Sequence, residues 1–189
     1  NKFSRGRVHL MRHNHDCILS SVKTIIIDNP ELTCRITGLE DRSPSRIILD
    51  KNLKIPIASN IVKSANKYRT IIFFNKINQK KIKALKSLKI KLIKTSLNVD
   101  GDFDLENILL KVKLLGFSRI FLESGLNLTT SFLNKDLVND FQLFISSKNL
   151  GMNGNNSFKN NMKLFLKNRK FTNEKVFLFD DKLISYKIK

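Results

Sequence analysis

Glu123 is the first side chain in the sequence whose position suggests chemistry. It ends a short apolar run, residues 120–122, and a turn through Gly125 leads into residues 126–133, whose apolar positions have helical spacing. A strand, a turn and a helix in this order bring a carboxylate next to the free amides of a helix start, which suits a phosphate-bearing ligand and a polar reacting group. Gly125 lets the turn adopt a positive φ or lets an anion approach the backbone. An ordinary strand-to-helix connection that carries a glutamate explains the same pattern.

A second carboxylate, Asp28, follows an apolar segment and precedes the turn at Pro30. Arg35 stands seven residues after it. As parts of a site, Asp28 could orient a ribose hydroxyl or a cofactor amide, and Arg35 could bind a phosphate. As parts of an ordinary loop, Asp28 is a turn former and Arg35 is a surface cation.

Other common sites have no matching motif in this sequence. His9 and His13 have the i, i+4 spacing of metal ligands on a helix, but no HExxH motif and no nearby cysteine or carboxylate at ligand spacing completes a site. Glycine-rich phosphate loops and the GxSxG turn of serine hydrolases are missing as well. The sequence therefore predicts a site without a metal, in which the helix after Gly125 holds any nucleotide.

The elements that must position these residues alternate between strands and helices up to about residue 146. We expect helices at 4–13, 79–88 and 104–115 and after Gly125, strands at 15–20, 46–50, 70–74, 89–94, 119–122 and 137–146, a polar loop at 151–161, and a terminal hairpin of 175–179 and 183–188. Residues 21–27 are expected as a short apolar segment, and Ser4 as the cap of the first helix. This order predicts an α/β fold with a mostly parallel sheet covered on both faces, antiparallel strands at one end, and a single domain.

The composition is basic, with a formal net charge of +19 over 189 residues. Such a charge suggests a polyanion partner, and a basic nucleic-acid-binding module is the alternative function. The lysines are spread along the whole chain, however, as a general composition bias would spread them, so we expect no nucleic-acid partner.

Cys17 and Cys34 lack metal or redox spacing, which is typical of a reduced, cytoplasmic protein. No apolar run is as long as a membrane span, so no membrane partner is expected.

Four stretches together resemble a known family: residues 8–35, 44–50, 119–146 and 149–154. Their order and spacing are similar to those of the reductase domain of the riboflavin-biosynthesis deaminase/reductase, the RibD C-terminal domain, which is related in fold to dihydrofolate reductase. The resemblance implies a three-layer α/β domain over residues 1–189, with a mostly parallel mixed sheet, helices on both faces and a C-terminal antiparallel hairpin. It also implies a homodimer that reduces 5-amino-6-(5-phosphoribosylamino)uracil to 5-amino-6-(5-phosphoribitylamino)uracil with NADPH, by hydride transfer to ribose C1′.

The resemblance assigns roles to individual residues. The positions matching substrate contacts are Arg12, Leu32, Arg35 and Glu123, and the two arginines fit the substrate phosphate. The positions matching cofactor contacts are Thr24, Asp28, Lys51, Gly125, Leu126, Asn127, Leu128, Thr129, Thr130 and Ser131. Asp28 and Glu123 are the candidates for the catalytic proton, and the resemblance does not choose between them. For Lys51, pairing with the 2′-phosphate is inferred from its charge alone.

The chain departs from the family pattern in two places. A strand and loop with a lysine and an SLDG-type stretch would precede Asn1, as would any deaminase domain, since the chain carries no deaminase motif. We therefore expect a longer natural chain that supplies the rest of the site. Residues 146–148 also lack the proline that is frequent after the preceding strand. An inactive homologue with a structural role is a further alternative.

Overall fold

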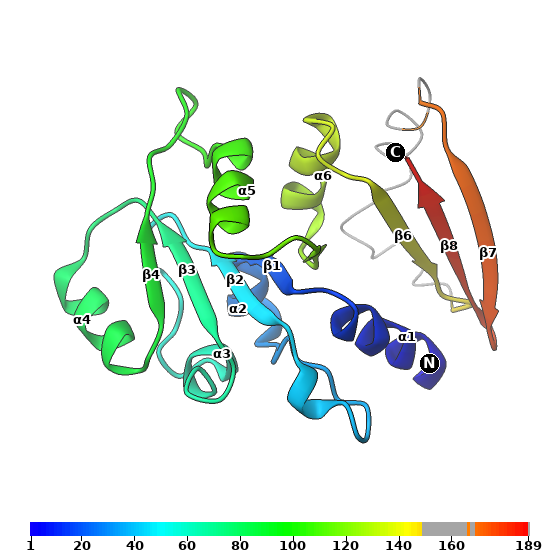
Figure 1. Cartoon of the computed structure of the whole chain (residues 1–189), viewed down its shortest axis with the longest axis horizontal. Helices are drawn as coiled ribbons and strands as arrows, with labels where there is room; N and C mark the ends of the chain where they lie inside the picture. The colour runs from blue at the N-terminus through cyan, green and yellow to red at the C-terminus, as the bar shows by residue number, and fades with distance from the viewer. Residues whose placement is uncertain (149–165, 167–168, 189) are drawn as a thin grey trace. The chain divides into compact units, whose positions relative to one another are not determined.

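The computed structural model describes residues 1–148, 166 and 169–188 and groups them into two compact units (Figure 1). One unit is His9–Gly125, and the other combines Asn1–Val8 with Leu126–Lys189. Helix α1, Lys2–His13, contributes residues to both units. A single reductase domain over residues 1–189 stays a prediction.

The His9–Gly125 unit is built on a parallel sheet with the strand order β4-β3-β2-β1-β5. Its strands are β1 Cys17–Ser21, β2 Ser45–Leu49, β3 Thr70–Phe74, β4 Lys91–Lys94 and β5 Ile120–Leu122. The chain moves outward from β1 to β4 and then returns to β5 on the other side of β1, so the strand order reverses at β1. In open α/β sheets, ligands bind outside the carboxyl ends of the strands at such a reversal. The topology therefore points to the residues that follow β1 and β5.

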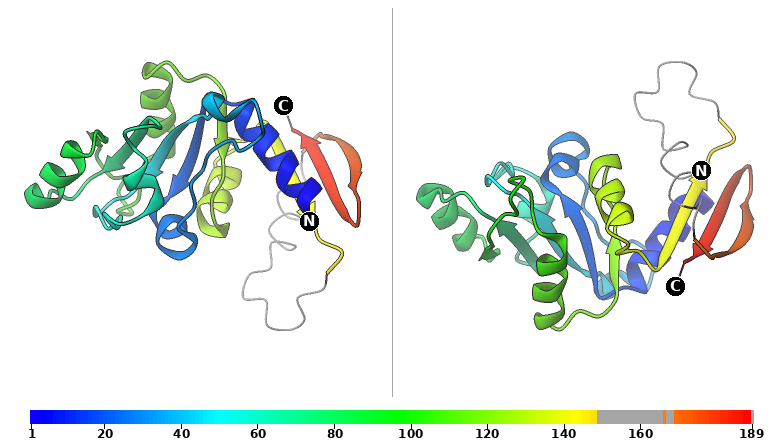
Figure 2. Two further views of the ribbon diagram at one scale, coloured as in Figure 1. Left: turned by 90° about the horizontal axis from the view of Figure 1, so that it is seen from below. Right: turned by 90° about the horizontal axis from the view of Figure 1, so that it is seen from above.

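Helices cover both faces of this sheet, as the sequence predicts. The bounds are α2 Val22–Asp28, α3 Asn60–Lys63, α4 Gln79–Ser87 and α5 Leu105–Leu114, with a 3₁₀ turn η1 at Glu40–Arg42. Helices α2 and α5 lie on opposite faces in both views of Figure 2. This follows from right-handed crossovers, because the connection through α5 runs across the sheet in the opposite direction to the others.

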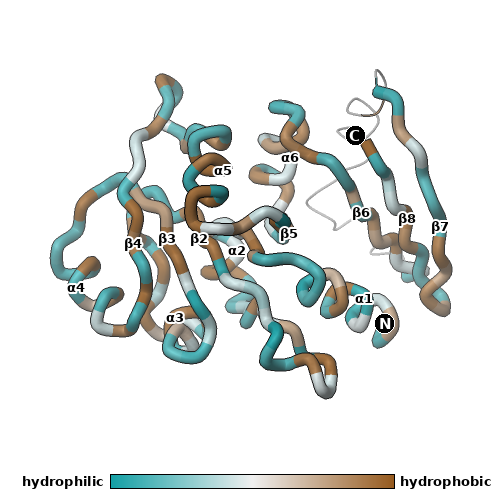
Figure 3. The backbone as a smooth tube through the Cα atoms, in the orientation of Figure 1, coloured by the Kyte–Doolittle hydropathy of each residue, from teal (hydrophilic) through white to brown (hydrophobic). Residues whose placement is uncertain are grey.

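The core of the unit lies between the sheet and the helices of one face. Ile18, Ile48 and Ile72, from the three central strands, are fully buried and pack with Ile61 of α3 and Leu85 of α4. Figure 3 shows hydrophobic colour over most of β3, as expected for a parallel strand buried on both faces. The edge strand β4 carries an exposed lysine at each end, which discourages pairing with another chain.

The second unit contains an antiparallel sheet with the order β6-β8-β7. Its strands are β6 Asp140–Ile145, β7 Thr172–Leu178 and β8 Asp181–Lys187, and its helix α6 is Leu126–Asn134. The predicted terminal hairpin is β7-β8, and the α/β class with a mostly parallel set of strands is confirmed. These antiparallel strands form a sheet of their own, because β6 pairs with β8 and not with a strand of the parallel sheet.

Several local expectations need adjustment. Ser4 is not the cap of α1, because the Asn1 side chain accepts from the backbone N–H groups of Phe3 and Ser4 at 2.9 and 3.0 Å. Residues 21–27 are mostly helical, since Ser21 accepts from the Thr24 N–H and caps α2. The predicted loop at 151–161 and the family stretch at 149–154 lie outside the described residues. No helix in the described part of the chain is long and apolar enough to cross a membrane.

Candidate functional site

The carboxyl ends of β1 and β5 are joined by hydrogen bonds that fix Glu123. The Glu123 N–H donates to the Leu19 carbonyl at 3.0 Å. One residue further along β1, the Ser20 hydroxyl donates to the Glu123 carbonyl at 2.6 Å, and the Ser124 hydroxyl donates to the Ser21 hydroxyl at 3.1 Å. These bonds extend the β1–β5 register, in which Leu19 pairs with Leu122. The predicted carboxylate is therefore held rigidly at the reversal of the strand order.

Glu123 is paired with Arg12, a second residue for which the sequence predicts substrate contact. Arg12 Nε donates to Glu123 Oε2 at 2.9 Å and Nη2 donates to Oε1 at 2.6 Å. Two parallel charge-assisted bonds of this kind are among the stronger side-chain contacts in proteins. The Arg12 residue is only 8% exposed, whereas the side chain of Glu123 is 29% exposed. Arg12 is thus largely buried behind a carboxylate that remains accessible.

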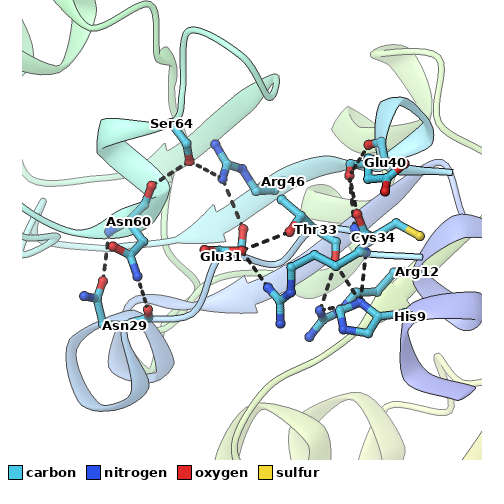
Figure 4. A network of polar contacts seen from close by, with 12 residues as sticks. His9, Arg12, Asn29, Glu31, Thr33, Cys34, Glu40, Arg46, Asn60 and Ser64 are labelled. Carbon is cyan, nitrogen blue, oxygen red and sulfur yellow. Dashed lines mark hydrogen bonds and ion pairs between the residues drawn. The ribbon is translucent and has the colours of Figure 1, made fainter. Parts of the chain in front are cut away.

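The segment that carries Arg35 is bound to α1 at the same place. Arg12 Nη1 donates to the Thr33 carbonyl at 2.9 Å, and the Arg35 N–H donates to His9 Nδ1 at 3.2 Å. The Arg35 guanidinium extends to Glu31 Oε2 at 2.7 Å, and both side chains are about half exposed. Figure 4 labels His9, Arg12, Glu31 and Thr33 of this network. The structure therefore brings Arg12, Arg35 and Glu123 into one connected network of contacts.

His9 Nδ1 lies between two backbone groups of this network. In one tautomer Nδ1 accepts the Arg35 N–H at 3.2 Å, and in the other it donates to the Thr33 carbonyl at 3.1 Å. Burial, and then the positive charge of Arg12, lower the pKa of His9 from its usual value of 6.5. The ring faces Arg12 and Arg35 as cations, Glu123 as an anion and the Thr33 carbonyl as an acceptor. Protonation would place a third cation near Arg12 and Arg35 and would exchange the bond from the Arg35 N–H for one to the Thr33 carbonyl.

The stability of the fold should therefore fall as the pH drops below about 6.5, since the unfolded chain then binds a proton at His9 that the folded chain resists. We expect His9→Gln, which cannot titrate, to show a shallower decline of Tm between about pH 7 and about pH 5 than the unchanged protein. His13 and His15 are common to both proteins, so the difference in slope reports His9 alone. Thermal unfolding followed across this pH range is the measurement, and parallel slopes would contradict the assignment.

Leu32 has an unusual backbone at the centre of this segment. Its φ is 52° and its residue is 1% exposed. A bulky residue rarely adopts this left-handed conformation, which costs about 1–3 kcal/mol and is retained only where surrounding contacts enforce it. Because the side chain packs in the core, any contact of Leu32 with a substrate would involve its backbone. Substrate contact at Leu32 stays a prediction.

Two predicted cofactor residues lie one turn apart on α2. Thr24 is half-buried, and its hydroxyl lies 3.2 Å from the hydroxyl of Ser21. Asp28 ends the helix and is exposed, and within the described residues its carboxylate has no hydrogen-bond or ion-pair partner. Residues four apart share one side of a helix. Asp28 can therefore contact a ligand without giving up an existing bond.

Lys51 follows β2 but is already engaged. Its Nζ donates to the Gly101 carbonyl at 2.7 Å and lies 3.5 Å from the Asp102 carboxylate. Beside it, the carboxyl ends of β2 and β3 border an open pocket of about 400 Å³, lined by Asn52, Lys54, Lys76, Ile77 and Asn78. Lys54 and Lys76 are exposed, and neither ammonium forms a hydrogen bond or an ion pair within the described ranges. These two lysines, which the sequence analysis did not select, are more available to an anion than Lys51.

The predicted phosphate-binding run begins at Gly125, which does not adopt a positive φ. A Cβ at this position would meet no described atom within 4 Å, so the backbone here is open to close approach, the second of the two roles expected for this glycine. Residues 126–131 form the first turns of α6 and belong to the other compact unit. In this part of α6, the Ser131 hydroxyl donates to the Asn127 carbonyl at 3.0 Å.

Some residues of the network were not selected from the sequence. Ser20, Thr33 and Arg46 were interpreted only as strand or loop residues, because the contacts they make join parts of the chain far apart in sequence. Elsewhere, burial raises the pKa of the free Cys17 thiol to about 12, which leaves it unreactive. Among the described residues, no three His, Cys, Asp or Glu side chains cluster as a metal site would require.

Comparison with known proteins identifies relatives of this arrangement. The family model of the RibD C-terminal domain matches residues 1–182. A riboflavin biosynthesis protein RibD of Aquifex aeolicus is 33% identical over 152 residues, which cover 79% of this chain and 40% of that protein. A 5-amino-6-(5-phosphoribosylamino)uracil reductase of Buchnera aphidicola (subsp. Acyrthosiphon pisum) is 29% identical over 166 residues, covering 79% of this chain and 74% of that protein.

Solved structures share the fold. RibD of Acinetobacter baumannii superposes with a TM-score of 0.77 at 16% identity, covering all of this chain and 51% of its own. A riboflavin biosynthesis reductase of Saccharomyces cerevisiae superposes with a TM-score of 0.74 at 19% identity, covering 99% of this chain and 81% of its own. The chain spans about 40% of the length of the RibD relatives that it matches. By the family match along residues 1–182, this chain belongs to the RibD C-terminal domain family.

Proposed function

We propose that this chain reduces 5-amino-6-(5-phosphoribosylamino)uracil to the ribitylamino compound with NADPH. One observation carries the proposal: the Arg12–Glu123 pair is joined to the Arg35 segment at the carboxyl ends of β1 and β5. This combination offers two cations for a phosphate and one accessible carboxylate for a sugar. The activity for which the Buchnera relative is named, 5-amino-6-(5-phosphoribosylamino)uracil reductase, supports the same substrate.

The proposed substrate is bound by exchange of existing partners. Arg35 is half exposed and bound only at its outer end to Glu31, so a phosphate can replace that carboxylate. Arg12 is buried and held on two sides, so it contributes charge and a fixed direction more than mobility. Glu123, with 29% of its side chain exposed, is the acceptor available to ribose hydroxyl groups.

The proposed reaction opens the ribosylamine ring and reduces C1′. Ring opening moves a proton to the ring oxygen and leaves an imine, which accepts a hydride at C1′ and a proton at nitrogen. NADPH supplies the hydride when bound. Asp28 and Glu123 are the protein groups that can hold or move these protons. Glu123 is already bonded to Arg12 through both oxygens, which favours Asp28 as the proton relay and Glu123 as the group that orders the ribose.

The cofactor fits two features of the chain. Gly125 leaves its backbone open for a phosphate, and α6 begins at the next residue. The free N–H groups at the start of a helix bind anions. The pocket beside Lys54 and Lys76 offers two free ammonium groups, which suits the additional 2′-phosphate of NADPH. We therefore propose NADPH in preference to NADH, with Lys54 and Lys76 adding to the role inferred for Lys51.

The experiment is a turnover assay of the full-length protein with the phosphoribosylaminopyrimidine and either nicotinamide cofactor. We expect oxidation of NADPH that depends on the pyrimidine. Changing Lys54 and Lys76 together to glutamine should weaken NADPH binding by about tenfold or more, since bonds to charged groups contribute about 1.5–3 kcal/mol. NADH binding should stay unchanged, and Lys63→Gln, another exposed lysine, serves as the control. A protein that neither binds NADPH nor reduces the pyrimidine would refute the proposed function.

We also propose a homodimer formed through the antiparallel sheet. Ile145 and Phe177 both pair with Lys182 in the strand register, so the three side chains lie in one row on one face. The two apolar residues are 40% and 70% exposed, and a second copy of the chain is the occupant we propose, because a two-fold dimer pairs the same patch on both subunits. We expect sedimentation to show a dimer for the unchanged protein and a monomer for Phe177→Lys. A monomer in both cases would exclude the proposed dimer.

Two further parts of the proposal concern the whole protein. A deaminase domain on the same natural chain fits the greater length of the RibD relatives. The sequence of the full-length gene product tests this part of the proposal. A cytoplasmic location fits two buried free cysteines, since reduced thiols are typical of that compartment. Cell fractionation tests the location.

A further inference from the structure

Arg46 is a fully buried arginine on β2 whose guanidinium is bonded on every side. Toward the sheet, Nε and Nη2 donate to the Thr70 hydroxyl at 3.1 and 2.7 Å. Nη2 also donates to the carbonyls of Ile61 and Tyr68 at 3.0 and 3.1 Å. Nη1 donates to the Ser64 hydroxyl at 2.8 Å and to the Glu31 carbonyl at 3.1 Å.

This charge has no carboxylate within hydrogen-bond distance among the described residues. Burial lowers the pKa of Arg46 to about 10, against an ordinary value of 12.5. A buried charge without an opposite charge contributes little net stability, because its desolvation offsets what its hydrogen bonds return. An apolar side chain of similar size would fill the same space. The arginine is therefore best explained by what its donors hold in place.

The carbonyl that Arg46 binds belongs to Glu31, the first residue of the segment that builds the proposed substrate site. Leu32, the next residue, has the strained left-handed φ of 52°, which needs contacts on both sides to persist. Beyond it, the Thr33 carbonyl accepts from Arg12 and the Arg35 N–H donates to His9. Figure 4 shows Arg46 between Ser64 and Glu31, at the opposite end of this segment from His9 and Arg12.

A second contact holds the same segment at its start. The Asn60 N–H donates to Asn29 Oδ1 at 2.9 Å, and Asn60 Nδ2 donates to the Asn29 carbonyl at 2.8 Å. Asn29 and Asn60 are polar residues at the outside of the unit, whereas Arg46 acts from the core. The Arg46–Glu31 bond is part-buried, whereas both Asn29–Asn60 bonds are exposed. A hydrogen bond away from water is stronger, so its loss is more costly.

We propose that Arg46 is a positioning residue for the reductase site: it sets the conformation of residues 31–35 through the Glu31 carbonyl and so aligns Arg12 and Arg35 for the substrate phosphate. The inference rests on the proposed function for the identity of that substrate. Its structural part, the coupling of Arg46 to His9 and Arg35 through one strained segment, can be measured without turnover.

The test compares Arg46→Lys with Thr70→Val. A lysine keeps the charge but cannot bond to both sides, since its ammonium is a single point donor. Thr70→Val removes two bonds of the same guanidinium and leaves Nη1 on Glu31. For Arg46→Lys we expect kcat/KM for the phosphoribosylaminopyrimidine to fall by on the order of 10²-fold, mainly through KM, and the pKa of His9, followed by NMR, to rise toward 6.5. For Thr70→Val we expect a lower Tm with KM and the His9 pKa unchanged.

Ser64→Ala covers the case in which Arg46→Lys does not fold. It removes one of the two acceptors of Nη1, so it should shift KM and the His9 pKa in the same direction by a smaller factor. The His9 resonance is assigned by its loss in His9→Gln. The inference is overturned if Arg46→Lys or Ser64→Ala lowers Tm but leaves both KM and the His9 titration at their original values. If the unchanged protein does not turn over the pyrimidine, the proposed function fails, while the His9 titration still decides the coupling.

Discussion

Replacement of Glu123 with glutamine is expected to lower kcat by on the order of 10²-fold or more while the fold is kept. Glutamine preserves the shape of the side chain but carries no charge and can accept only through one oxygen. Arg12 then loses one of its two bonds of 2.9 and 2.6 Å, and the acceptor for the ribose is weakened. Initial rates with saturating NADPH give the change in kcat.

The stability of Glu123→Gln separates catalysis from folding. Loss of one charged hydrogen bond at a partly exposed pair should remove about 1–3 kcal/mol at most, and a chain of this size loses about 2–4 °C of Tm for each kcal/mol. Glu106→Gln, at an exposed position in the first turn of α5, is the matched control and should leave both Tm and kcat unchanged. Unaltered turnover in Glu123→Gln would remove Glu123 from the site.

Asp28→Asn is expected to lower kcat by on the order of 10²-fold with no measurable change in Tm. Asp28 is exposed at the end of α2, and no described residue depends on its carboxylate for a bond. An asparagine there keeps the turn, because it is an equally good turn former, but it cannot accept a proton. Rates measured against pH report whether the group that titrates in the unchanged enzyme is lost.

The two variants together decide which carboxylate moves the proton. A proton relay at Asp28 predicts that Asp28→Asn flattens one limb of the pH–rate profile, while Glu123→Gln lowers the rate at every pH. The reverse pattern would assign the proton to Glu123. Asp100→Asn, exposed and distant in sequence from both, is the control that should change neither profile.

The parallel sheet was predictable because the residues of each strand indicate that strand without reference to distant parts of the chain. Residues 71–74 are all apolar, and residues 70–74 form β3 with the predicted bounds. Helix α5 was equally clear, since Asp104 caps it by accepting from two N–H groups and Gly116 follows with a φ of 91°. Glu123, at the end of an apolar run, could be selected for the same reason. These features depend on neighbouring residues alone.

The rest depends on contacts between distant residues, which the sequence does not display. Arg46 lies near the start of the apolar strand β2, where an arginine is ordinarily exposed, and only the fold shows that it is buried against Thr70, Ser64 and Glu31. The pairing of Arg12 with Glu123 joins residues 111 positions apart. The separate antiparallel sheet likewise follows from the pairing of β6 with β8, which no local pattern specifies.

The pairing of Arg12 with Glu123 and of Arg35 with Glu31 has a consequence for the kinetics of association. Each arginine proposed to bind the phosphate is neutralised at short range by its own carboxylate, so the site itself exerts little attraction on a distant anion. The pull on an approaching phosphorylated ligand comes instead from the net charge of +19 spread over the chain, which salt screens within about 10 Å at an ionic strength of 0.1 M. The rate of encounter is therefore governed by the charge of the whole surface, whereas the residence time is governed by the exchange of Glu31 for a phosphate at Arg35.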